Sequence, residues 1–178
     1  MQNITEDQVI INLKSVALQE PKNAENHCNL AIALAERGDV AGAINSYRAA
    51  IQIEPNHLAA SSNLGSIYRS MGNFEEAFTI FKNIVDVFPN DISAYINLGA
   101  LYKQDGNLSK AERTFQKAVS LLPLSSEAYF NLGNALRYEG DIDISIECYE
   151  KAIRLKPNLV VAHYYLANAL KDGRRLKE

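Results

Sequence analysis

Residues 97–123 read NLGALYKQDGNLSKAERTFQKAVSLLP and carry the signals of two short helices. Before Gly106, apolar side chains recur at three- and four-residue steps, as on one face of a helix. Gly106 can adopt the left-handed conformation that ends a helix, and Asn107 can cap the next one. A second apolar face follows, and Pro123 stops it because its ring has no N–H to donate. The stretch predicts a helix, a tight turn and a second helix.

The same pattern returns along the whole chain with a fixed period. The chain has 178 residues and five prolines. The prolines are evenly spaced, each as far from the next as Pro21 is from Pro55. A constant step of this length indicates a repeat array rather than one closed globule, and stability then comes from stacked neighbours. The columns that keep this step are Pro21, Pro55, Pro89, Pro123 and Pro157; Leu30, Leu64, Leu98, Leu132 and Leu166; Ala31, Gly65, Gly99, Gly133 and Ala167; Gly38, Gly72, Gly106 and Gly140; and Tyr47, Phe81, Phe115 and Tyr149.

Two of these columns predict how the helices pack. The small residue after each column leucine would let the two helices of a pair approach closely, and the aromatic residue would fill the space against the neighbouring pair. The leucine, small, glycine, aromatic and proline columns together resemble those of the tetratricopeptide repeat family over residues 24–156. This resemblance implies an all-α fold, a right-handed superhelical solenoid of antiparallel helix pairs.

We therefore expect a single array over residues 1–178. Residues 1–20 would be a half repeat supplying a second helix, with Val9, Leu13 and Val16 at its packing positions. The last repeat departs from the pattern, because Arg174 stands where the turn glycine would be. The predicted full repeats, counted from each proline, are 21–54, 55–88, 89–122 and 123–156, and residues 157–178 would be a partial repeat or a cap.

The composition excludes several classes of protein. The chain is 47% hydrophobic and 22% charged, with a formal net charge of −3. This mild acidity argues against binding to nucleic acid, which needs a basic surface. No apolar run approaches the ~20 residues that cross a bilayer, and no basic-then-apolar start suggests a signal peptide. We therefore expect a cytoplasmic protein without membrane insertion.

No catalytic or metal-binding constellation emerges from the sequence. Cys28 and Cys148 cannot make a four-ligand metal site and are interpreted as free, half-buried thiols. His27 and His163 share a column with two tyrosines, so we expect them to pack, whereas His57 lies beside a proline turn and is predicted to face solvent. The chain is predicted to be no enzyme and to need neither metal nor cofactor.

The family resemblance implies that the first helix of each pair lines a concave groove. One residue before each column leucine stands an asparagine, and a carboxamide can bond the N–H and the C=O of a peptide together. The row resembles the repeats of O-GlcNAc transferase, in which such a ladder holds extended polypeptides by their backbone. The asparagines predicted to bind a peptide are Asn29, Asn63, Asn97 and Asn131.

A basic row stands further along the same helices, at Arg69, Lys103, Arg137 and Lys171. It is either a set of solvated helix C-termini, where cations suit the dipole, or a strip that attracts an acidic segment. Towards the C-terminal end the groove columns become aromatic, at positions that include Tyr164 and Tyr165. The other predicted groove residues, which would set specificity, are Ser62, Ser66, Ile96, Gln104, Phe130, Asn134, Tyr138 and Asn168.

The predicted function is a protein–protein interaction module that binds an extended, acidic polypeptide segment in this groove. Two alternatives stay open. The chain can be the substrate-recognition region of a larger enzyme, such as an O-GlcNAc-transferase-like glycosyltransferase. It can also be a self-associating scaffold in which the unfinished C-terminal helix pairs with another copy.

Overall fold

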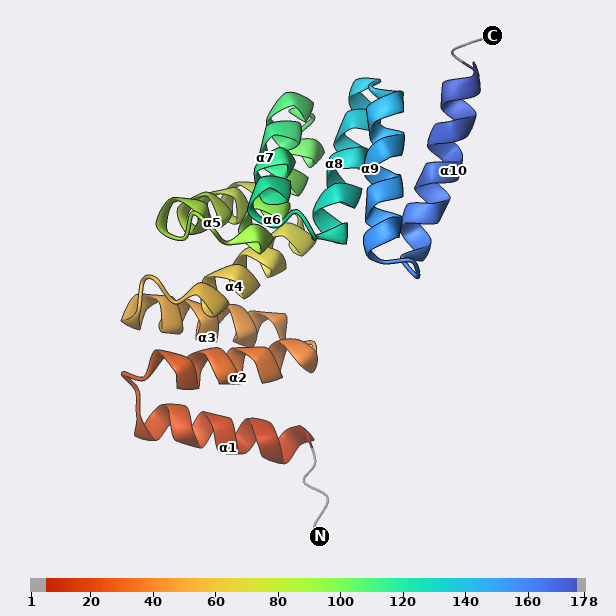
Figure 1. Cartoon of the computed structure of the whole chain (residues 1–178). Helices are drawn as coiled ribbons and strands as arrows, with labels where there is room; N and C mark the ends of the chain where they lie inside the picture. Colours follow the sequence, from red (N-terminus) through yellow and green to blue (C-terminus); the bar gives the residue numbers. More distant parts are fainter. Residues whose placement is uncertain (1–5, 176–178) are drawn as a thin grey trace. The chain divides into compact units, whose positions relative to one another are not determined.

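The computed structural model describes residues 6–175, which form ten α-helices without a strand (Figure 1). The prediction of an all-α fold is confirmed. The chain divides into two compact units with the boundary between Val87 and Phe88, and each is described by itself. The first unit contains α1 (Glu6–Gln19), α2 (Ala24–Glu36), α3 (Val40–Ile53), α4 (Leu58–Met71) and α5 (Phe74–Val87). The second contains α6 (Ile92–Gln104), α7 (Leu108–Leu121), α8 (Ser126–Glu139), α9 (Ile142–Leu155) and α10 (Val160–Arg175).

Within each unit every helix packs against the next one along the chain. The even-numbered helices α2 to α10 are the first helices of the predicted pairs, and they begin at evenly spaced residues, Ala24, Leu58, Ile92, Ser126 and Val160. The helices thus recur with the period of the sequence. The repeat boundaries counted from the prolines stay a prediction.

The turn between paired helices depends on a left-handed glycine. Gly106 has φ +77°, a conformation that costs other residues steric strain. Its N–H donates to the carbonyl of Lys103 at 3.1 Å, and the N–H of Asn107 donates to that of Tyr102 at 2.8 Å. These bonds satisfy carbonyls at the end of α6. In α10 the turn glycine is replaced by Arg174, and the helix continues to Arg175.

The predicted capping of the second helices is confirmed at two turns and wrong at a third. Asp39 accepts from the N–H of Gly42 at 2.9 Å, and Asn107 accepts from that of Lys110 at 3.3 Å. Asp141, at the N-terminus of α9, makes no side-chain capping bond. The aspartate there is left to interact with the helix dipole alone.

His57 caps a first helix and does not face solvent as predicted. Its ring is 9% exposed, and Nδ1 accepts from the N–H of Ala60 at 3.3 Å, so His57 is the N-cap of α4. The other ring nitrogen, Nε2, lies 3.2 Å from the carboxylate of Glu25 in α2. Since Nδ1 accepts a bond, the ring proton resides on Nε2 and is donated to Glu25. Asn23, Asp91 and Ser125 are the N-caps at the equivalent positions.

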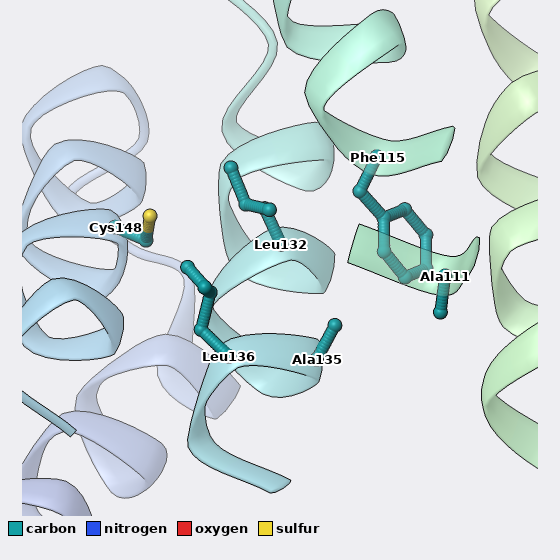
Figure 2. Close-up of a cluster of buried hydrophobic side chains, with 6 residues drawn as sticks. All are labelled: Ala111, Phe115, Leu132, Ala135, Leu136 and Cys148. Carbon is teal, nitrogen blue, oxygen red and sulfur yellow. The ribbon is translucent and has the colours of Figure 1, made fainter. Parts of the chain in front are cut away.

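The small and aromatic columns make the core of each pair. A Cβ atom placed on Gly99 of α6 would lie only 2.7 Å from the ring of Phe115 in α7. The predicted close approach of the paired helices is confirmed. The aromatic ring packs against the glycine of its own pair, and not only against the neighbouring pair as predicted. Phe115 also reaches the next pair. Figure 2 shows the cluster that it forms across α7, α8 and α9 with Ala111, Leu132, Ala135, Leu136 and Cys148.

Helix α1 packs with a different face from the one predicted. Val9 and Val16 are each 41% exposed, whereas the neighbouring Ile10 and Ala17 are buried. The predicted positions are those that face the first helix of the same pair, and no such helix precedes α1 within the described residues. Ile10 and Ala17 lie on the adjacent face and pack α1 against α2.

Both cysteines are free and more deeply buried than predicted, at 1% exposure for Cys28 and 8% for Cys148. Burial raises the pKa of the Cys148 thiol to about 11, from an ordinary value of 9.0. The folded chain therefore holds the Cys148 proton over a range of pH in which the unfolded chain releases it.

We expect this difference to make the fold less stable in alkali. The contribution of Cys148 is fully present below pH 9 and is lost as the pH rises towards about 11. Urea unfolding at a series of pH values measures the loss, and Cys148→Ala should make it shallower. Cys28→Ala is the matched control for removal of a buried thiol, since the pKa of Cys28 is raised less. An equal pH dependence for the wild type and Cys148→Ala would contradict the assignment.

Candidate protein-binding surface

The first helices adjoin one another in the second unit, so they can offer a continuous surface. Helix α8 contacts both α6 and α10 in addition to the second helices between them. Asn97 on α6 and Asn131 on α8 are both half-buried, as is Asn63 on α4 in the first unit, and Asn29 on α2 is exposed. Each of the four asparagines is therefore accessible to some degree.

Two of the asparagines already make hydrogen bonds inside the protein. Asn97 donates through Nδ2 to the carbonyl of Ser93 at 2.9 Å, one turn earlier in α6, which leaves its Oδ1 able to accept. Burial raises the pKa of Tyr47 to about 12, and a side-chain hydrogen bond with Asn63 opposes that rise by a smaller amount. Asn63 thus also supports packing, a role that the sequence did not predict for this row.

The cations of the basic row are not equally available to a ligand. Arg137 on α8 donates through Nε and Nη2 to Oδ2 of Asp172 on α10, at 3.1 and 2.6 Å. These bonds raise the pKa of the guanidinium, and the carboxylate of Asp172 compensates its positive charge within the protein. The pair joins residues 35 positions apart and ties α10 to α8. The sequence did not predict this pairing, because the relative rotation of α8 and α10 is not encoded in the spacing.

The other three cations of the row differ from Arg137. Lys171 on α10 is exposed. The Nζ atom of Lys103 lies 5.6 Å from the ring centre of Tyr138, a cation–π contact between α6 and α8. Burial lowers the pKa of Lys103. The ring of Tyr138 remains 66% exposed. Arg69 in α4 has a buried Nε without a hydrogen-bond partner among the described residues. Lys103 and Tyr138 therefore place a half-buried cation and an exposed aromatic ring together on α6 and α8.

An aromatic cluster occupies the C-terminal part of the second unit. The ring centre of Phe130 lies 5.4 Å from that of Tyr165, edge to face, and 6.1 Å from that of Tyr149. Tyr164 packs edge to face on Tyr165 at 5.6 Å and is 66% exposed. Phe130 therefore contributes to the joint between α8, α9 and α10, while Tyr164 presents its ring to solvent.

Most of the remaining predicted groove residues are accessible, with one exception. Asn134 is 5% exposed, and its Oδ1 accepts from the hydroxyl of Tyr149 at 2.9 Å, so it belongs to the core and cannot contact a ligand. Gln104 is exposed. The half-buried residues are Ser62, Ser66, Ile96 and Asn168, and the hydroxyl of Ser66 donates to the carbonyl of Ser62 at 2.9 Å.

A metal cluster and a membrane span are both absent from the described residues. Nowhere in residues 6–175 do three or more His, Cys, Asp or Glu side chains gather as a metal ion requires. Every helix of that range is too short or too polar to span a membrane.

Comparisons with known proteins support the repeat architecture of the chain. Three tetratricopeptide repeat models match the chain, over residues 33–72, 56–123 and 126–159. No curated protein gives a significant match. Among solved structures, MamA from Desulfovibrio magneticus RS-1 is 27% identical, with a TM-score of 0.77 over 86% of this chain and 87% of that one. TTC0263, a thermophilic repeat protein from Thermus thermophilus, is 22% identical, with a TM-score of 0.72 over 93% and 90%. The similarity of the chain to these structures shows that it has the helical-repeat solenoid fold.

Proposed function

Because the chain belongs to the tetratricopeptide repeat family, we propose that it is a protein-binding module that holds an extended polypeptide against its first helices. The observation that carries the proposal is the arrangement of α6 and α8. These helices are in contact and bear two accessible asparagines, a lysine and an exposed tyrosine. Carboxamides would bond the backbone of the ligand, which fixes its register without demanding a particular sequence.

The charges support an acidic ligand. Arg137 is paired with Asp172, so in the second unit the lysines of the row supply the accessible positive charge. Lys103 is half-buried on α6, the helix that carries Asn97, and Lys171 is exposed on α10. A partly buried ammonium loses hydration and gains from an incoming carboxylate. The exposed ring of Tyr138 beside it can cover an apolar side chain of the same ligand. The proposed ligand is an extended segment that mixes acidic and apolar residues.

An experiment with synthetic peptides tests this proposal. Fluorescein-labelled extended peptides of equal length, graded from basic to acidic, are titrated with the chain and followed by anisotropy. We expect the acidic peptides to bind most tightly and to weaken as salt is raised. Equal binding of the basic and acidic series, or no binding by either, would contradict the proposed ligand class.

The same peptides test the role of Lys103. Lys103→Gln should lower the association rate of the acidic peptide and reduce its salt dependence, since it removes a cation from the helix that carries Asn97. Lys117→Gln is the matched control, because it removes one exposed charge from the second helix α7. Stopped-flow mixing measures both variants, and equal effects would show that only net charge matters.

The alternative that the chain is the substrate-recognition region of a glycosyltransferase stays a second prediction from the sequence.

A further inference from the structure

Helix α1 has an apolar face that no helix of the described residues covers. Val9 and Val16 stand in the columns of Ala43 and Ala50, which are both 0% exposed in α3. In α1 the two valines are each 41% exposed, and Leu13 between them is half-buried. The helix packs on α2 through its adjacent face. Among the described residues, α1 is therefore a second helix without its first helix.

Helix α10 has the complementary opening. It packs on α9 and α8 through Ala162 and Ala169, each 0% exposed. Leu170 is 45% exposed, whereas Leu136 at the same place in α8 is 2% exposed. Ala167 is exposed, whereas Gly133 in its column is buried under Tyr149 of the following helix α9. Among the described residues, α10 is a first helix without its second helix.

We propose that α1 of one copy of the chain packs against α10 of a second copy and completes a helix pair between them. Leu13 would lie over Ala167, as Phe115 lies over Gly99 and Tyr149 over Gly133 within the chain. A leucine is shorter than these rings, so it leaves room for the methyl group of Ala167. Val9 and Val16 would flank the contact, with one of them covering Leu170.

A second copy is the occupant because the two faces are the separated halves of one interface. That interface forms within the chain at α2 and α3, α4 and α5, α6 and α7, and α8 and α9. An unrelated partner helix would need apolar side chains at the same three positions of a second helix, which α1 already carries as Val9, Leu13 and Val16. The contact uses different surfaces on the two copies, so it is heterologous and each added copy leaves a free α1 and a free α10. The inference is independent of the proposed peptide-binding surface.

The first test is the mass of the chain in solution as a function of concentration. The proposed contact is a single pair of helices, whereas a standard interface buries ~1,600 Å², so we expect weak association. Sedimentation equilibrium should show a mass that rises with concentration and passes beyond the dimer. A monomer at every concentration would overturn the proposal, and so would a mass that stops at the dimer, which indicates a two-fold contact of one face with itself.

The second test mixes two variants that are each blocked at one face. Val9→Glu with Val16→Glu blocks α1, and Ala167→Glu with Leu170→Glu blocks α10. These side chains are exposed in the single chain, so both variants should keep the wild-type circular dichroism. Each variant alone should associate at least about tenfold more weakly, because a charge is placed in an apolar contact.

Mixing the two variants is the distinguishing step. The chain blocked at α1 still offers α10, and the chain blocked at α10 still offers α1, so the mixture should form a one-to-one heterodimer and nothing larger. Leu18→Glu on α1 and Val161→Glu on α10 are matched controls, since they change exposed apolar residues outside the two faces and should leave association unchanged. Self-association of one blocked variant alone at wild-type strength, or a mixture that stays monomeric, would refute the pairing.

Discussion

Gly99→Leu is expected to destabilise the chain by about 1–3 kcal/mol or more, because it overpacks the contact between α6 and α7. The first added carbon would already lie 2.7 Å from Cε1 of Phe115, which is 1% exposed. The ring is held by α8 as well as α7, so it cannot swing away without opening the cluster of Figure 2. Urea unfolding measures the loss.

Amide hydrogen exchange locates the same damage. Neighbouring helix pairs contact only each other in a repeat array, so protection should fall in α6, α7 and α8, while α2 and α3 keep theirs. Gly173→Ala is the matched control. It also adds a methyl group to a helical glycine, but its Cβ would meet Ile142 at an ordinary 3.4 Å, so stability should be unchanged or slightly improved. Unchanged protection around Gly99 in the leucine variant would refute the packing argument.

Replacing Asn63, Asn97 and Asn131 together by alanine is expected to weaken peptide binding by roughly one to three powers of ten. Each net hydrogen bond to the ligand backbone contributes about 0.5–1.5 kcal/mol. The best-binding peptide of the graded series is titrated against the variant by anisotropy. Alanine favours helix, so α6 and α8 should fold at least as well. The bond between Asn63 and Tyr47 is lost in α4, and this makes Asn63→Ala the substitution to test for stability on its own.

The control for the asparagine row is Asn45→Ala with Asn83→Ala. Both residues are exposed asparagines that lie on second helices, α3 and α5, and not on first helices. Their replacement should leave the affinity unchanged. If the triple variant binds as tightly as the wild type with its helical fold intact, the asparagines do not hold the ligand and binding lies elsewhere.

The fixed period of the sequence was enough to predict the helices, because its signals are local. A glycine that adopts φ near +80° and a proline without an N–H act within a few residues of the chain, and the small residue meets an aromatic ring on the very next helix. Gly106 and Gly99 could thus be assigned their roles from the amino-acid sequence alone. The accessible row of asparagines followed from the same register, since one turn of helix sets which side chains share a face.

Contacts between helices that are distant in sequence could not be predicted in this way. Asp172 forms an ion pair with Arg137, and Asn134 lies in the core bonded to Tyr149. His57 is buried at the start of α4 beside Glu25. Each depends on how one helix is rotated and shifted against another, which is settled by the packing of many side chains together. The exposure of Val9 and Val16 has the same origin, because a periodic sequence specifies the face of a helix but not whether a neighbour is present to cover it.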